Sequence, residues 1–383
     1  MPHTRYAYDH MADSLSSKAK TLLLRMQRFY GRIERPFSSI SLVGGFVFDA
    51  LTLTRVDEFW ENFWVVAHLA IVTTAALLAN LVENEPGAEE DPAKLHFWLV
   101  NIMQFFFGGI FATYLVFYFR SGTIVTSWPF LALLAAAFVA NERFKRHYAR
   151  LTFQIALLFL AYYAFAIYLM PILFHRISTG IFLVSGAVAL AAISLFIAAL
   201  GRFSRERFIG KARWAVPLSI AGILISVNAL YFANLIPPLP LSLNDAGIYQ
   251  SFTVNGPGNY TAQAEPRPWW NYFSWSPTVH VTAGTTLYAY TAVFAPTALN
   301  TDIVHVWQWY DPAQRTWITR GRIPLAVSGG GSAGWRTFSL VPNVAAGAWR
   351  VNVETPQGAL IGQMRFTVAI VSSTPPLATT SID

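Results

Sequence analysis

Long apolar runs fill the first two thirds of this 383-residue sequence and limit what it can fold into. Most are close to the roughly 20 residues that a helix needs to cross about 30 Å of hydrocarbon. Charged residues make up only 12% of the chain, whereas about 25% is usual in soluble proteins. We therefore expect a bundle of about seven transmembrane helices over residues 37–236. The runs lie near 37–54, 60–82, 96–119, 122–140, 151–173, 179–200 and 214–236.

The first of these runs is the weakest candidate for a membrane span. It contains Asp49 and the pair Gly44 and Gly45, so it could tilt, re-enter or pack closely through its small residues. Whether residues 37–54 cross the bilayer stays open. The preceding segment, 1–36, is basic, and its apolar residues recur at near-helical spacing. This pattern fits an amphipathic helix on the cytoplasmic membrane surface, with a disordered tail as the alternative.

The distribution of Lys and Arg predicts the orientation in the membrane. The loops 141–150 and 201–213 hold four and five basic residues, and such loops stay in the cytoplasm. With seven spans, the predicted cytoplasmic segments hold 17 basic residues and the opposite loops hold three. The sequence therefore predicts a multi-pass protein of the cell (inner) membrane. Its N-terminus is expected in the cytoplasm and its C-terminal region in the periplasm or outside the cell.

The C-terminal region follows a different pattern. A Pro-rich linker is expected at 237–247, after which the apolar period changes from helical to two. Around eight short strands separated by turn-rich pieces predict an all-β, immunoglobulin-like antiparallel sandwich over 248–370. The loop SGGGSAG (328–334) is interpreted as a hairpin connection, and 371–383 as a flexible tail.

Several functional classes find no support in the sequence. The chain has no Cys, which excludes thiolate metal sites and cysteine nucleophiles. It also lacks metalloprotease, serine hydrolase and nucleotide-binding motifs. Residues 238–383 hold seven Arg and six acidic residues, so a nucleic-acid partner is not expected. No catalytic residue, metal or cofactor is predicted.

Four segments near the C-terminus carry a family resemblance: YAYTAVFAP, HVWQWYD, WRTFSLVP and GAWRVNVETPQGALIGQMRFTV. These segments, within about 285–368, resemble the module known as domain of unknown function 2914. Its features here are His305, Trp307, Trp335, Arg336, Gly347, Trp349, Val351, Gly358 and Phe366. The resemblance implies a bacterial membrane protein whose module follows a hydrophobic region. It implies no activity, so no functional residue is carried over.

The densest aromatic cluster is PRPWWNYFSWSP (266–277). It could pack against the sandwich, rest on the bilayer near the last span, or form a stacking platform for a glycan or protein ligand. The third reading makes the cluster a candidate ligand-binding site. Its candidate ligand residues are Trp269, Trp270, Tyr272 and Trp275.

His305, Trp307 and Trp309 alternate along one expected strand, so they should share one face. His305 and Trp307 are further candidate ligand contacts. No second His or carboxylate stands at a spacing that indicates a metal site, and a hydrogen-bonded His within the sheet is the simpler interpretation.

Asp49 and His68 are ionisable residues at membrane depth, which makes them functional candidates. They could be brought together by antiparallel helices and relay protons or act on a lipid headgroup. Alternatively, Asp49 lies at the interface and His68 bonds within a helix. We expect six other polar residues to bond between helices: Asn80, Asn101, Gln104, Gln154, Asn228 and Asn234.

These features favour a membrane-anchored binding or scaffolding protein over an enzyme. Its β-sandwich would be presented to a protein, an envelope polymer or a membrane complex. The alternative is a transporter, or a membrane-embedded lipid or glycan transferase, that uses Asp49 and His68. A seven-span sensor would need a partner for its cytoplasmic output. The sequence does not indicate an oligomeric state.

Overall fold

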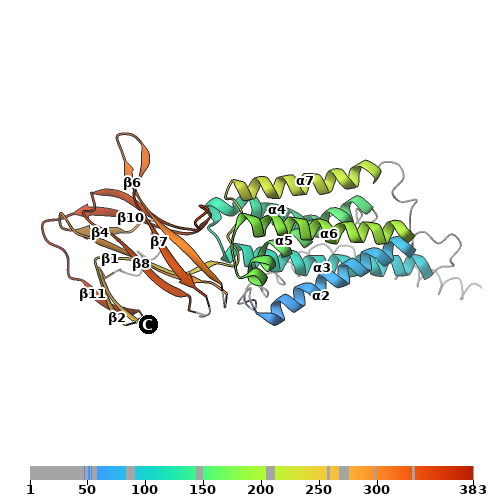
Figure 1. Cartoon of the computed structure of the whole chain (residues 1–383), viewed down its shortest axis with the longest axis horizontal. Helices are drawn as coiled ribbons and strands as arrows, with labels where there is room; N and C mark the ends of the chain where they lie inside the picture. The colour runs from blue at the N-terminus through green and yellow to red at the C-terminus, as the bar shows by residue number, and fades with distance from the viewer. Residues whose placement is uncertain are drawn as a thin grey trace, which may run out of the picture. The chain divides into compact units, whose positions relative to one another are not determined.

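The structure is a computed structural model in which helices precede strands (Figure 1). The described residues are 47, 51, 53, 58–82, 91–143, 150–203, 212–256, 259–266, 276–296, 299–329 and 333–382. The helices are α2 (Phe59–Val82), α3 (Asp91–Arg120), α4 (Ile124–Arg143), α5 (Leu151–Phe174), α6 (Thr179–Phe203) and α7 (Ala212–Phe232). The strands are β1 (Ser242–Tyr249), β2 (Ser251–Gly256), β3 (Asn259–Ala264), β4 (Thr278–Val281), β5 (Leu287–Phe294), β6 (Asn300–Asp311), β7 (Thr316–Ser328), β8 (Trp335–Val341), β9 (Gly347–Glu354), β10 (Leu360–Ile370) and β11 (Ala378–Ile382).

The six apolar runs from residue 60 onward each form a helix among the described residues. Five of these helices are long and apolar enough to cross a membrane. The exception is α4, whose apolar stretch, Thr126–Asn141, is shorter. The first run, 37–54, lies outside the described residues apart from isolated positions, as does all of 1–36.

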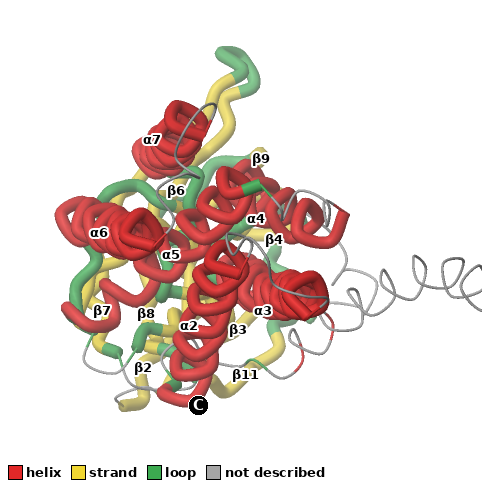
Figure 2. The backbone as a smooth tube through the Cα atoms, turned by 90° about the vertical axis from the view of Figure 1, so that its right-hand side faces the viewer, coloured by secondary structure: helices red, strands yellow, loops and turns green. Residues whose placement is uncertain are grey.

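Helix α5 is the central helix of the bundle. It contacts α2, α3, α6 and α7, and Figure 2 shows it among the other helices when they are viewed nearly end-on. Two buried tyrosines of α3 bond to its backbone: the Tyr114 hydroxyl donates to Ala161 O at 2.9 Å, and that of Tyr118 donates to Ala164 O at 2.8 Å. These bonds give buried hydroxyls the partners that an apolar interior otherwise lacks.

Polar side chains connect the helices at several points, as the sequence indicates. Asn80 donates to the Gln154 side chain at 2.6 Å, and Asn228 donates to the Tyr163 hydroxyl at 3.1 Å. Asn101 instead bonds within its own helix, to Phe97 O. Asn234 has a φ of 56° just after α7, a left-handed conformation that Asn tolerates at a helix end.

The helix faces that point away from the bundle are apolar. Only 11% of the apolar stretch of α7 and 33% of that of α6 are buried. Trp60, Trp64, Trp98 and Trp214 are between 60% and 73% exposed near helix ends. Surfaces of this kind are stable in lipid or against a partner, but not in water.

The strands form three sheets. The first is β1-β5-β8, the second is β4-β10-β9-β6-β7, and the third is β11-β3-β2. Neighbouring strands are antiparallel except for β4 and β10, which are parallel. The antiparallel pairing agrees with the sequence-based expectation.

The three sheets pack in layers with β1-β5-β8 in the middle. One core, between this sheet and the five-stranded sheet, includes Leu287, Trp307 and Phe366. A second, aromatic core includes Tyr260 of β3 and Tyr290 of β5. Successive side chains of β5 therefore point into different cores, which explains why nearly all of that strand is buried.

Three segments differ from the sequence-based expectation. Strand β1 begins at Ser242, inside the expected linker 237–247, and pairs with β5. Strand β11 lies inside the expected tail 371–383 and pairs with β3. The SGGGSAG loop joins β7 and β8, which belong to different sheets, so it is not a hairpin connection. Composition did not indicate the pairing of β1 with β5 or of β11 with β3, because the partner strands are distant in sequence.

Candidate functional site

The candidate site lies on the outward-facing side of the five-stranded sheet. Trp307, Trp349 and Phe366 point into the core, so the residues that alternate with them on β6, β9 and β10 point outward. We call this surface the outer face. Its residues are Gln308, Tyr310, Trp317, Thr319, Arg322, Arg350, Asn352, Glu354, Gln363 and Arg365.

Hydrogen bonds connect the outer face across four strands. Gln308 of β6 donates to the Thr319 hydroxyl of β7 at 3.2 Å and accepts from Arg350 Nε of β9 at 2.6 Å. Gln363 of β10 donates to Asn352 of β9 at 2.7 Å and accepts from Arg365 Nε at 2.5 Å. Such cross-strand side-chain pairs stabilise a sheet and restrict the rotamers of their members.

One end of this network is aromatic. The Arg350 guanidinium carbon lies 4.3 Å from the Trp317 ring centroid, and the Tyr310 ring lies 5.3 Å from that of Trp317. A guanidinium on an indole face is held by cation–π attraction. The arrangement therefore fixes the Arg350 side chain from two sides, through Gln308 and through Trp317.

The charges of the outer face are predominantly positive. Arg350 and Arg365 are cross-strand partners in the β9–β10 ladder. Burial lowers the pKa of the Arg350 guanidinium, the charge of Arg365 lowers it further, and Glu354 raises it. Glu354 accepts from Asn352 at 3.0 Å and lies 3.8 Å from Arg322. The outer face thus carries three guanidinium groups and one carboxylate.

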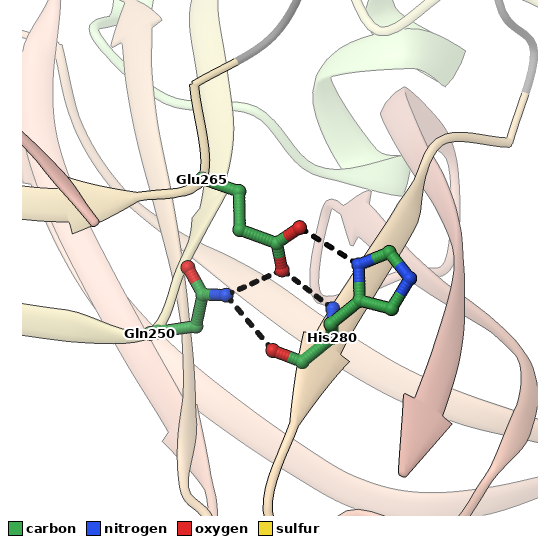
Figure 3. A network of polar contacts seen from close by, with 3 residues as sticks. All are labelled: Gln250, Glu265 and His280. Atoms are coloured by element: carbon green, nitrogen blue, oxygen red, sulfur yellow. Dashed lines mark hydrogen bonds and ion pairs between the residues drawn. The ribbon is translucent and has the colours of Figure 1, made fainter. Parts of the chain in front are cut away.

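A second polar network lies at the free edge of β4 (Figure 3). The His280 backbone N–H donates to Glu265 Oε1 at 2.6 Å, and its ring Nδ1 lies 2.8 Å from Glu265 Oε2. The Gln250 amide donates to Glu265 Oε1 at 2.8 Å and to His280 O at 3.1 Å. Because β10 bonds to Pro277 and Val281, the His280 backbone groups face the free edge. Gln250 and Glu265 therefore cap that edge and block further strand pairing.

His305 and Trp307 lie in the core and not on the outer face. Both are fully buried, and they share their face of β6 with Trp309 as the alternation predicts. His305 Nε2 lies 2.9 Å from the Thr291 hydroxyl and its Nδ1 lies 2.8 Å from the Ser339 hydroxyl. The structure thus confirms the interpretation of His305 as a hydrogen-bonded residue within the sheet. Solvent reaches neither the His305 nor the Trp307 side chain.

The Ser339 hydroxyl decides which groups donate and which accept hydrogen bonds in this buried network. Trp307 Nε1 can only donate, and it donates to Ser339 Oγ at 2.9 Å. If Ser339 donates in turn to His305 Nδ1, His305 Nε2 carries the proton and donates to Thr291. This neutral tautomer satisfies every group. Burial accordingly lowers the pKa of His305 to about 4.

Of the remaining sequence-based candidates, the structure describes only His68. Trp269, Trp270, Tyr272, Trp275 and Asp49 lie outside the described residues. His68 Nδ1 lies 2.7 Å from Trp64 O, and its ring packs edge-on against Phe106. Within the described part of the chain, no three His, Asp or Glu side chains group as metal ligands would.

The outer-face arginines were not singled out from the sequence. Alternation along β9 and β10 places Arg350 and Arg365 opposite the core residues of their strands. A single sequence does not give the register of β9 and β10, which places these two arginines directly opposite each other. The signal that could have found them is the TPQG turn, whose Gly358 has a φ of 90° and so marks a tight connection between the strands.

Apolar helices followed by layered antiparallel sheets define a two-part chain, with its candidate site on the second part. Residues 300–368 match the family model described as "Protein of unknown function (DUF2914)". This finding confirms the family resemblance for a C-terminal module. The match runs from β6 into β10 and contains all ten outer-face residues. Comparison with curated proteins gives no match.

Comparison with solved structures gave matches with low TM-scores. An immunoglobulin-like protein from Pseudomonas aeruginosa is 12% identical, with 34% of this chain and 98% of that chain covered and a TM-score of 0.20. A β-glucosidase from Listeria innocua, in complex with gluconolactone, is 9% identical, with 33% and 16% covered and a TM-score of 0.18. An alkylpurine DNA glycosylase from Pseudomonas fluorescens, bound to DNA, is 10% identical, with 80% and 98% covered and a TM-score of 0.21. Scores this low carry no functional argument.

Proposed function

We propose that this chain is a membrane-anchored binding protein that presents its β-sheets on the periplasmic or external side of the cell membrane. The observation that carries the proposal is the outer face. Its hydrogen-bonded side chains span four strands and hold positive and aromatic groups in place without burying them in a core. Preorganised polar surfaces of this kind suit recognition of a partner, because less side-chain freedom is lost on binding.

The proposed orientation has seven spans, with residues 37–54 as the first. Loops rich in Lys and Arg then lie in the cytoplasm after α4 and after α6. Helix α7 would carry the chain out again. The orientation of the C-terminal part depends on the 201–213 loop being cytoplasmic and on α7 crossing the membrane, so it holds even if residues 37–54 do not span.

The alternative, a transporter or membrane-embedded transferase, finds less support. Within the described residues, His68 has no carboxylate partner, and its bond goes to a backbone oxygen. A groove of about 510 Å³ between α2, α5 and α6 is lined mostly by apolar residues. Its polar contact joins the Thr73 and Tyr162 hydroxyls at 2.5 Å, which is a bond between helices and not an acid–base pair.

Site-specific photo-crosslinking in native membranes tests the binding function. A photoreactive residue at Thr319, an exposed position on the outer face, should give a crosslinked adduct. The matched control is the same residue at Val254, which is 55% exposed on β2, outside the outer face, and should give none. Equal adducts at both positions, or none at either, would contradict the proposed role of the outer face.

A further inference from the structure

Arg350 and Arg365 stand directly opposite each other on neighbouring strands. Like charges at such positions destabilise a sheet, yet neither guanidinium forms an ion pair among the described residues. The carboxylate of the outer face, Glu354, is engaged by Asn352 and Arg322. The fold therefore keeps two positive groups together at a cost in stability, and an anion between them would remove that cost.

Both arginines are held in the same way. The Nε of each donates to a glutamine side chain, Gln308 for Arg350 and Gln363 for Arg365. Each anchor uses one donor of a group that has five. The terminal nitrogens of both guanidinium groups, which form the bidentate fork, have no hydrogen-bond partner among the described residues. Two preorganised forks thus face outward on the same surface.

The choice of cation is also informative. Residues 238–383 contain seven Arg and no Lys. A guanidinium binds a carboxylate or phosphate through two parallel hydrogen bonds, whereas an ammonium acts as a point charge. General attraction to anions would be served equally well by Lys, so the composition favours directional recognition of oxyanions.

We propose that Arg350 and Arg365 form a binding site for the carboxylate or phosphate groups of an acidic polysaccharide. This inference rests on the proposed function and names its ligand class. The half-buried rings of Tyr310 and Trp317 beside Arg350 favour a sugar polymer over an acidic peptide, because sugar rings stack on aromatic faces. A lipid headgroup offers the same chemistry, but a surface that docks on a bilayer inserts apolar side chains as well. The exposed large apolar residues of the described sheets are Val254, Trp335, Leu340 and Ile370, and none belongs to the outer face.

The test measures binding of polygalacturonate to the full chain in nanodiscs of zwitterionic lipid. Arg350→Gln and Arg365→Gln should each weaken binding on the order of tenfold, since each removes charge-assisted hydrogen bonds. The matched control is Arg315→Gln, which removes the same charge from the exposed β6–β7 turn. It should change the affinity by no more than about twofold, as expected of an isolated surface charge.

Further arms separate the possible ligand sources. Neutral dextran, polyglutamate and vesicles containing phosphatidylglycerol should each bind more weakly than polygalacturonate. Equal binding of polyglutamate or of the vesicles would overturn the assignment to an acidic polysaccharide. Equal losses for Arg315→Gln and Arg350→Gln would overturn the site itself. If these arms fail while the Thr319 adduct persists, the inference falls and the proposed function stands.

A stability measurement guards against a purely structural explanation. Because Arg350 and Arg365 repel each other, Arg365→Gln should leave the unfolding temperature of the ligand-free chain unchanged or raise it at low salt. A residue retained for the fold would behave in the opposite way. A lowered unfolding temperature together with unchanged polygalacturonate binding would therefore overturn the proposal.

Discussion

Individual buried residues link the five-stranded sheet to the β1-β5-β8 sheet through polar groups. His305 of β6 and Ser339 of β8 come from different sheets and bond within the core at 2.8 Å. Buried polar groups that lack a partner cost roughly 1 to 3 kcal/mol, so the bonds of this network favour one alignment of the sheets over others. The sequence suggested a hydrogen-bonded His305 but could not name Thr291 and Ser339, because they are distant along the chain.

Stability of the β-sheets should depend on pH through His305. The pKa of this residue is about 4 in the folded chain and about 6.5 in an unfolded one. Above pH 6.5 the neutral form prevails in both states and the stability is fully present. As the pH falls from 6.5 toward 4, the unfolded chain takes up the proton first, and roughly 3 kcal/mol is lost.

Urea-dependent proteolysis of the full chain in nanodiscs can measure this free energy of unfolding. His305→Leu should be less stable at pH 7, because Thr291 and Ser339 lose a partner, and its pH dependence should be shallower. The control, His280→Gln, changes the half-buried histidine of β4. This variant should keep the same dependence of stability on pH as the unmodified chain between pH 6.5 and 4. A wild-type slope in His305→Leu would show that other groups are responsible.

At the scale of elements, the sequence predicted what local patterns determine. The six runs from residue 60 form helices because a helix satisfies the backbone hydrogen bonds of a long apolar segment within the segment itself. Strands with regular alternation, such as β9 and β10, were also predicted. What could not be predicted was the pairing of short edge strands such as β1 and β11, since their burial depends on partners elsewhere.

The free edge of β4 provides a prediction at this scale. Glu265→Ala removes the acceptor of the His280 N–H and leaves only the Gln250 bond to His280 O at that edge. Hydrogen exchange at the His280 amide should become faster by about 5- to 150-fold, which corresponds to the roughly 1 to 3 kcal/mol of such a bond. Amides of β9, which lies between β10 and β6, serve as the internal control. Unchanged exchange at His280 would mean that Glu265 does not protect the edge.

At the scale of the whole molecule, two parts with different solvent requirements share one chain. The helices expose apolar side chains around most of α6 and α7, while the sheets present the charged and amide groups of the outer face. A binding role outside the cytoplasm requires that the chain leave α7 on the far side of the membrane. The proposed orientation is therefore the central claim, and the outer-face chemistry matters biologically only if it holds.

Cysteine labelling tests the orientation most directly, because the chain has no Cys of its own. Gln314→Cys places a thiol in the exposed β6–β7 turn, and Ser204→Cys places one in the basic loop 201–213. The cells are kept intact at the cytoplasmic membrane, and any outer membrane is made permeable to the reagent. A maleimide that cannot cross the cytoplasmic membrane should then label Gln314→Cys. It should label Ser204→Cys only after the cells are lysed. Labelling of Ser204→Cys in intact cells, with Gln314→Cys protected until lysis, would contradict the account.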